Sequence, residues 1–283
     1  MVATLKKNLK ETVKQALAER PEIRPFPAAV TRVISACQDP SSTARTFEEI
    51  IECDPALASR VLRMANSPLF GVSREVRSVS HATAVLGMRH LRNLAASVAG
   101  AGMFATGKGV AEERHRLWLH SLGCATVARV LAEERRSVAS DDAFLAGIFH
   151  DVGKLFLFDV DPQSYGSIAA DENSVLVERE VYGVTHEEVG QKSAHSWGLA
   201  ENIKVAIGSH HCPKDATAHE EFVMLISGAN DLAKYWGIGT RSVQDEELVA
   251  RIIEKTGLSP AGLDQLHERV TSQFANVTDM FGS

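Results

Sequence analysis

The chain has 283 residues, a length that supports one large hydrophobic core or two smaller ones. Hydrophobic residues make up 45% and charged residues 23%, which is typical of globular domains, and the net charge of −6 argues against nucleic-acid binding. No apolar run reaches the length of a bilayer span and the N-terminus has no signal-peptide core. We therefore expect no membrane segment and a cytoplasmic protein whose four cysteines, none in a C-x-x-C pair, are free thiols.

Apolar residues recur three and four positions apart along most of the chain, and this spacing predicts an all-α fold. The first amphipathic helix is expected over about 5–17. Thr46–Glu49 has the pattern of a capping box and is expected to open a short helix. Asp54 and Pro55 then supply an N-cap and a first-turn proline for the next helix.

Two further helices are expected over about 80–85 and 89–98. They are followed by spaced glycines that predict a loop, namely Gly100, Gly102, Gly107 and Gly109.

The second half is expected to open with a long helix over about 112–135, which carries His120. A second helix is expected over 143–155, followed by a loop over 159–173. Thr185–Glu188 is another capping box, which places His186 in the first turn of its helix. A helix after Pro213 carries Asp231, and the tail ends in a last amphipathic helix.

The adjacent residues His150 and Asp151 end an apolar stretch and are followed by Val-Gly-Lys154. Burying an imidazole and a carboxylate side by side is costly unless something holds them. A metal ion holds both, because it binds a neutral imidazole and an ionised carboxylate together.

Other polar residues strengthen this interpretation collectively. A lone buried histidine is more often a hydrogen-bonded core residue than a ligand, but packed helices can bring several such side chains to one point. The candidate metal ligands are His120, His150, Asp151, His186, His210, His211 and Asp231.

This ligand set favours one or two divalent transition-metal ions, Fe, Mn, Zn or Ni, over Ca or Mg. Two ions bridged by a carboxylate would generate a hydroxide nucleophile and clamp a phosphate. On that hypothesis Asp151 and Lys154 are the candidate catalytic residues, with Lys154 contacting the phosphate. The alternative for Lys154, a solvated lysine near a helix C-terminus, has equal weight.

With these residues laid out, the second half resembles the HD superfamily of metal-dependent phosphohydrolases, whose H…HD…D pattern falls on His120, His150-Asp151 and Asp231. The first half resembles the signature of HDOD domains in the run IECDPALASRVLRMANS over 51–67 and in SVSHATAVLG over 78–87. The resemblance covers about 20–240. It implies an all-helical bacterial regulator of signal transduction, and many members of the family lack the HD ligands.

The second half is also similar to HD-GYP phosphodiesterases in HDVGK over 150–154, HEEVG over 186–190, the pair His210-His211 and AND over 229–231. In that group the matching positions ligate a two- or three-metal centre. The Gly-Tyr-Pro motif that follows the histidine pair there is replaced here by CPKD over 212–215. The resemblance therefore does not predict cyclic-di-GMP hydrolysis.

Two functions stay open at this point, of which we favour the first, and we expect a bound metal in either case. One is an HDOD regulatory module that binds a signalling protein partner or a small phosphorylated ligand. The other is a phosphohydrolase acting on a nucleotide or cyclic dinucleotide. The expected segments are an N-terminal helix (1–20), an N-terminal HDOD half (20–110), an HD-like half with the metal site (111–240) and a C-terminal extension (241–283), in an oligomeric state that the sequence leaves open.

Overall fold

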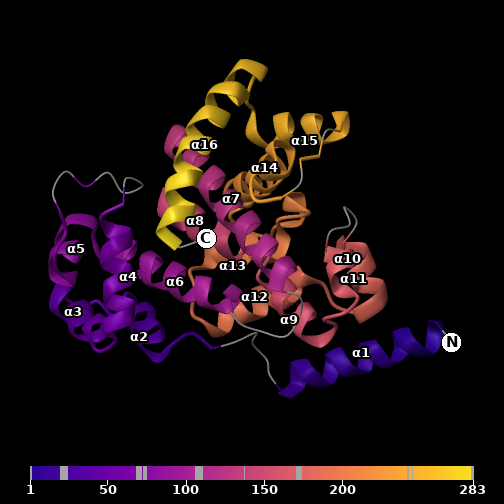
Figure 1. Ribbon diagram of the computed structural model, residues 1–283, viewed down its shortest axis with the longest axis horizontal. Coiled ribbons are helices and arrows are strands. Elements are labelled where there is room, and N and C mark those ends of the chain that lie inside the picture. The colour runs from indigo at the N-terminus through magenta and orange to yellow at the C-terminus, as the bar shows by residue number, and fades with distance from the viewer. Residues whose placement is uncertain are drawn as a thin grey trace.

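The computed structural model describes residues 2–19, 25–67, 72, 75–105, 111–136, 138–169, 174–240, 242–243 and 245–281. These residues form helices and connecting turns without a β-strand, which confirms the predicted all-α fold. Figure 1 shows the helices over 28–86 gathered on one side of the molecule and the long helix α7 (Ala111–Arg135) running through its centre. None of the helices in the described part of the chain combines the length and apolar character that crossing a bilayer requires.

The N-terminal half consists of a first helix and a small bundle that packs on one long helix. It comprises α1 (Val2–Glu19), α2 (Ala28–Ala36), α3 (Ala44–Glu52), α4 (Pro55–Ala65), α5 (Val79–Leu86) and α6 (Met88–Ala105). Helices α2 to α5 pack on one another and on α6, and α6 continues into contact with α7 and α8. Helix α1 lies apart from this bundle, against α11 and α9 (Figure 1).

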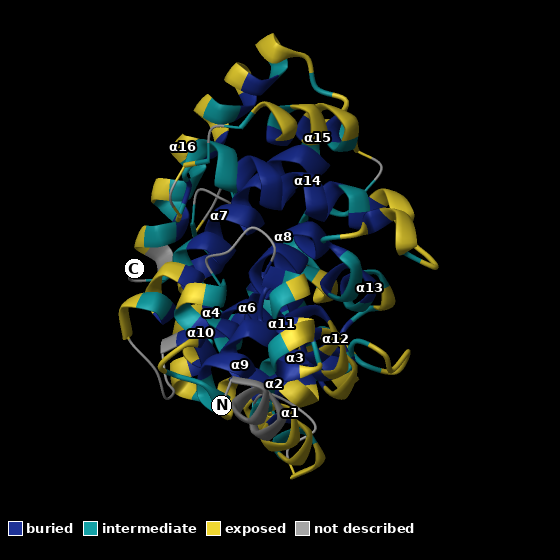
Figure 2. Cartoon of the chain, turned by 90° about the vertical axis from the view of Figure 1, so that its right-hand side faces the viewer, coloured by how far each residue is buried: buried dark blue, intermediate teal, exposed yellow. Residues whose placement is uncertain are grey.

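The second half surrounds two central helices. It comprises α7 (Ala111–Arg135), α8 (Ser140–Phe149), α9 (Gly153–Val160), α10 (Tyr165–Ala169), α11 (Ser174–Tyr182), α12 (His186–Ser196), α13 (Glu201–Ser209), the 3-10 turn η2 (Pro213–Asp215), α14 (Glu220–Trp236), α15 (Glu246–Thr256) and α16 (Pro260–Phe281). Helix α7 packs against α8, α14 and α16, and Figure 2 shows α7, α8 and α14 as the most deeply buried elements. One hydrophobic core runs from Val13 to Val277 through both halves. The four segment boundaries stay predictions.

Three of the expected helix starts are confirmed in detail, and one capping residue is corrected. The Asp54 carboxylate accepts hydrogen bonds from the first amides of α4, and the Thr185 hydroxyl accepts one from Glu188 in the predicted capping box. Helix α7 also begins where expected. Thr46, however, does not cap α3. Thr43 is the N-cap, because its hydroxyl accepts from the Thr46 amide and the Thr46 hydroxyl accepts from the Thr43 amide.

The glycine-rich loop was predicted wrongly at its start. Gly100 and Gly102 lie inside α6, whereas Gly107 and Gly109 lie outside the described residues. A methyl group on Gly100 would lie 2.8 Å from the Phe149 ring. Glycine at this position therefore permits close packing of α6 on the end of α8, and spacing alone cannot separate that role from a loop.

The helix expected over 143–155 is in fact two helices. Helix α8 ends at Phe149, a turn follows over 150–152, and α9 begins at Gly153. The loop expected over 159–173 instead holds the end of α9 and the short helix α10, and residues 170–173 lie outside the described part. The break after Phe149 matters most, because it places His150 and Asp151 between two helices.

Gly153 allows the backbones of α9 and α12 to meet. A Cβ at this position would lie 1.9 Å from the carbonyl oxygen of His186. We predict that Gly153→Ala destabilises the protein by about 1–3 kcal/mol, because the two helices must separate to admit the methyl group. Chemical denaturation followed by circular dichroism measures this change.

The matched control is Gly102→Ala, an exposed helical glycine whose added Cβ would meet nothing within 4 Å. This variant is expected to gain up to about 1 kcal/mol from helix propensity. Equal stability of the two variants would contradict the close approach of α9 and α12.

Candidate metal centre

His150 occupies the C-terminal end of α8 with one ring nitrogen anchored. Its Nδ1 lies 2.8 Å from the carbonyl oxygen of Gly147. A carbonyl oxygen only accepts hydrogen bonds, so Nδ1 carries the hydrogen and Nε2 of the neutral ring presents a lone pair. That Nε2 lies 3.4 Å from Oδ2 of Asp151, in the turn that follows.

His186 and His210 repeat this arrangement from two other helices. In the first turn of α12, Nδ1 of His186 lies 2.7 Å from Oε2 of Glu178. At the end of α13, Nδ1 of His210 lies 3.1 Å from the carbonyl oxygen of Ile207. In both rings the anchored nitrogen is the donor, which leaves Nε2 as a lone pair.

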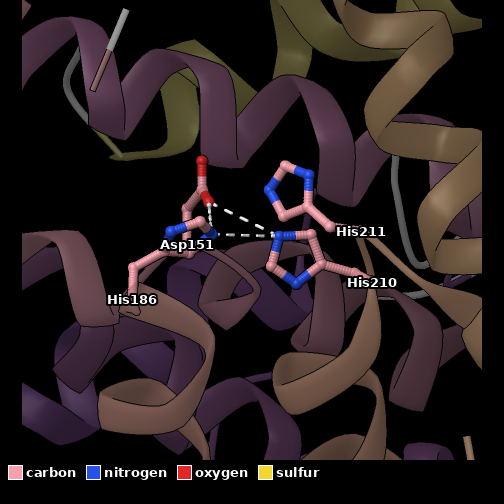
Figure 3. Close-up of side chains that lie close together, drawn as sticks. All are labelled: Asp151, His186, His210 and His211. Atoms are coloured by element: carbon pink, nitrogen blue, oxygen red, sulfur yellow. Dashed lines mark hydrogen bonds and ion pairs between the residues drawn. The ribbon is translucent and has the colours of Figure 1, made fainter. Parts of the chain in front are cut away.

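The two free nitrogens converge on the same carboxylate oxygen. Nε2 of His186 lies 3.3 Å and Nε2 of His210 lies 3.6 Å from Oδ1 of Asp151 (Figure 3). The two Nε2 atoms are 3.4 Å apart. Lone pairs that face a carboxylate and one another at these distances repel unless a cation lies between them.

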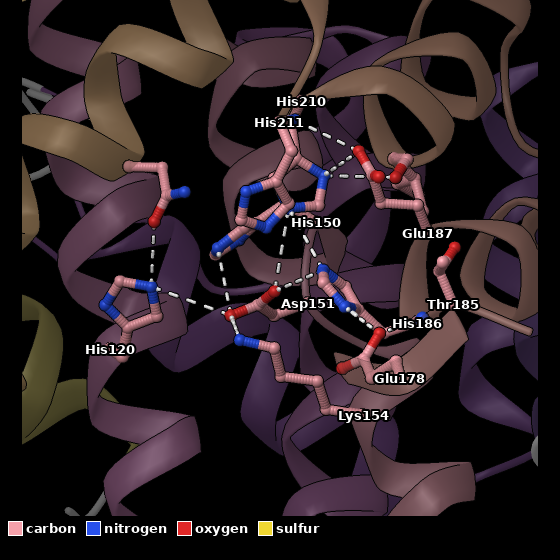
Figure 4. Close-up of polar contacts among 12 residues, drawn as sticks. His120, His150, Asp151, Lys154, Glu178, Thr185, His186, Glu187, His210 and His211 are labelled. Carbon is pink, nitrogen blue, oxygen red and sulfur yellow. Dashed lines mark hydrogen bonds and ion pairs between the residues drawn. The ribbon is translucent and has the colours of Figure 1, made fainter. Parts of the chain in front are cut away.

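Two more histidines complete the cluster. His120 on α7 places Nε2 at 3.7 Å from Oδ2 of Asp151 and at 3.1 Å from Oδ1 of Asn230 on α14. The ring of His211 lies beside those of His186 and His210, and its backbone amide donates to Glu187. Figure 4 shows the rings arranged around Asp151.

These residues form two groups that share one carboxylate. Asp151 lies with His186, His210 and His211 in one group, and with His120 and His150 in the other; within each group the candidate ligand atoms all lie within 4.8 Å of one another. All the side chains are buried except that of His211, which is half-buried.

The residues fit a metal ion on two counts. Several of their buried polar atoms have no hydrogen-bond partner, namely Nδ1 of His120, Nε2 of His150, Oδ1 of Asp151 and Nε2 of His211. Orphaned polar atoms of this kind are costly in a folded interior. Imidazole and carboxylate donors are also the set that borderline transition metals prefer.

The electrostatics keep the central carboxylate ionised. Burial opposes ionisation of Asp151, but Lys154 and His150 outweigh it and hold the pKa of that carboxyl well below its usual value. The ammonium of Lys154 lies 2.9 Å from Oδ2 of Asp151. Burial lowers the pKa values of His120, His210 and His211, so these imidazoles are neutral and able to bind a metal.

The pKa of His150 shifts in the opposite direction. Burial disfavours its charged form, but Cys124 and Asp151 outweigh burial and raise the pKa of His150 to about 10. A proton on Nε2 can therefore offset the charge of Asp151 when no cation is bound, and a metal ion would displace that proton.

Asp231 is the predicted ligand that the structure does not bring into either group. Its Oδ2 lies 2.6 Å from the ammonium of Lys255 on α15. The preceding residue, Asn230, contacts His120 instead. Neighbouring helical positions differ by about 100° around the axis, so only one of the two can face α7.

Sequence reasoning missed two carboxylates that hold the ligands in place. Glu178 on α11 accepts from both the amide and Nδ1 of His186, each at 2.7 Å, and also from the Tyr165 hydroxyl at 2.6 Å. Oε1 of Glu187 lies 3.7 Å from Nδ1 of His210. Only Glu187 left a signal, as the residue after His186; Glu178 lies on a helix that the sequence analysis did not expect.

An all-helical bundle with a buried histidine–aspartate cluster is the class that the fold and this centre define. Within that class the chain belongs to the HDOD domain family, whose pattern matches residues 23–213. The match includes the candidate ligands from His120 to His211 and ends before α14.

Solved structures share this fold over nearly the whole chain. A candidate phosphohydrolase from Shewanella amazonensis is 26% identical, with a TM-score of 0.74 over 96% of this chain and 97% of its own. An HDOD domain protein of unknown function from Geobacter sulfurreducens has a TM-score of 0.73 at 24% identity, over 97% of this chain and 98% of its own. The latter similarity bears on the fold alone.

A curated protein from Treponema pallidum is 28% identical over 212 residues. The match covers 73% of this chain but only 40% of that relative, so the chain spans less than half the length of the curated protein it matches.

The contact between Glu178 and His186 predicts a measurable effect on metal affinity. Glu178→Gln weakens the acceptor that fixes the tautomer of His186, because the amide is a poorer acceptor than the carboxylate and carries competing donors. We expect affinity for Zn²⁺ or Mn²⁺ to fall about 10- to 100-fold, measured by competition with a chromophoric chelator.

Glu188→Gln is the control for this variant. Glu188 is exposed in the same first turn of α12, and a glutamine oxygen can still accept from the Thr185 amide. Metal affinity should stay near that of the wild type. An equal loss in both variants would show that lost charge, rather than the hold on His186, sets the affinity.

Proposed function

We propose that this protein is a metal-binding regulatory module of bacterial signal transduction. One observation supports the metal above all: three imidazoles have Nδ1 anchored, and their Nε2 atoms are directed at Asp151. Carbonyls and carboxylates that hold the second nitrogen of a ligating histidine are the usual support of a metal centre.

The regulatory role is supported by the separation of the N-terminal helices from the candidate metal ligands. Among the described residues, helices α2 to α6 contribute no side chain to either candidate ligand group. A hydrolytic centre does not need this half, whereas a module that recognises a signalling protein partner or a small phosphorylated ligand can use it as a surface. Family membership over residues 23–213 includes both parts.

The second candidate function is metal-dependent phosphoester hydrolysis. Its specific support is Asp151, which belongs to both ligand groups and so could bridge two ions. Bound ions would supply a hydroxide nucleophile and neutralise phosphate charge. The chain's own residues would then act as ligands, with Lys154 holding Asp151 ionised and its ammonium beside the cluster. The Shewanella candidate phosphohydrolase has the same fold.

Removal of Asp151 tests the centre itself. Elemental analysis of protein purified without chelator or affinity-metal exposure should find one or two transition-metal ions per chain. Asp151→Ala should lose them, and its free energy of unfolding should fall by about 3–5 kcal/mol, because buried charged and polar partners lose their counterpart. Unchanged metal content in this variant would refute the assignment.

Asp231→Ala is the matched carboxylate control, since Asp231 pairs with Lys255 outside both groups. It should keep its metal. The metal-loaded wild type then decides between the two functions on a panel of nucleotides and cyclic dinucleotides: turnover that Asp151→Ala abolishes establishes the hydrolase, and full metal content without turnover supports the regulatory module.

A further inference from the structure

We infer that Lys154 and Lys234 form a two-lysine subsite for a phosphate group beside the metal ligands, with Lys234 at its entrance. The inference rests on the proposed metal centre and assigns a ligand class to it. Lys154 is fixed by its contact with Asp151, and Figure 4 shows its ammonium directed at that carboxylate. The new element is Lys234.

The register of α14 places Lys234 over the cluster. Asn230, one turn earlier on the same helix, contacts His120 through its side-chain oxygen at 3.1 Å. Residues four positions apart share one helical face. Helical side chains also lean towards the N-terminus, so the Lys234 side chain extends back over the turn that holds Asn230.

The partner that would normally neutralise Lys234 is already occupied. Asp231 lies three residues before it, which is a suitable spacing for an ion pair, but the Asp231 carboxylate binds Lys255 on α15 at 2.6 Å. Within the described part of the chain, no hydrogen bond or ion pair of the Lys234 ammonium is found. The Lys234 ammonium therefore has no direct ion-pair partner there, and only the more distant charges of Asp151 and Asp231 attract it.

Charge and burial both favour an anion at this point. Burial lowers the pKa of Lys234, repulsion from Lys154 adds to that effect, and attraction from Asp151 and Asp231 opposes it. A phosphate group carries up to two negative charges and accepts hydrogen bonds on several oxygens, so it can neutralise both lysines at once.

The burial pattern limits how a ligand can enter. Most of the cluster is buried, but His211 and Lys234 are half-buried and so reach the surface. An anion approaching from solvent would meet these two side chains first. This arrangement suits free orthophosphate or the terminal phosphoryl group of a phosphate monoester.

Isothermal titration of orthophosphate into the metal-loaded full chain tests the subsite. Lys234→Met should weaken phosphate binding about 10- to 100-fold, as expected for one lost charge-assisted hydrogen bond. Lys234→Arg, which restores the charge, should recover most of the affinity. Lys192→Met removes an exposed lysine on α12 and should change nothing.

The outcomes separate this inference from the proposed function. Equal phosphate affinity in Lys234→Met and wild type, with metal content unchanged, overturns the subsite and leaves the metal centre standing. A wild type that binds no phosphate at millimolar concentration also overturns it. A wild type without metal refutes the proposed centre, and the same titration on that protein still decides whether Lys234 binds phosphate. A nucleoside monophosphate that competes with orthophosphate identifies the ligand as an ester; orthophosphate alone identifies the free ion.

Discussion

The second half of this protein is organised around an ionised carboxylate, Asp151, that several neutral imidazoles face in a buried interior. A cluster of buried carboxylate and imidazole groups is costly, and the candidate ligands are held in place in a similar way. His150 and His210 end helices, His186 begins one, and in each case a nearby acceptor fixes Nδ1. A position at a helix end limits the conformational freedom of each ring. The break between α8 and α9 lies where the Asp151 carboxylate turns towards the other candidate ligands.

The same helices are joined again at their far ends. At the start of α8, Asp142 accepts hydrogen bonds from Arg92 and Asn93 on α6, and its other oxygen accepts from Asn202 at the start of α13. Helices α8 and α13 carry His150 and His210 at their opposite ends. One buried carboxylate therefore connects the N-terminal half to two of the ligand-bearing helices.

Much of this could be predicted from the sequence, because caps and apolar spacing are local signals. Asp54, the Thr185 capping box and the His150-Asp151 pair can each be identified from a few neighbouring residues of the sequence. The remainder depended on packing between distant segments. Gly100 resembles a loop residue in the sequence, and only its packing against Phe149 explains the glycine. Glu178 belongs to no sequence motif, and its role is seen only in its contact with His186. Asp231 and Asn230 differ by one position, and only the rotation of α14 decides which of them faces His120.

Helix α14 lies beyond the part of the chain that the family pattern matches. The family match ends at residue 213, so it includes the histidines but not Asn230, Asp231 or Lys234. On α14, the uncharged side chain of Asn230 contacts His120. A carboxylate at that position would add negative charge. Lys255 pairs with Asp231, so among the described residues Lys234 has no direct ion-pair partner. Both features make the surroundings of the histidine cluster more positive than a carboxylate at position 230 would allow. Under the proposed two-lysine subsite, the choice of ligand would depend on the register of α14 and on Lys255, whereas the histidine cluster would determine only that a metal can bind.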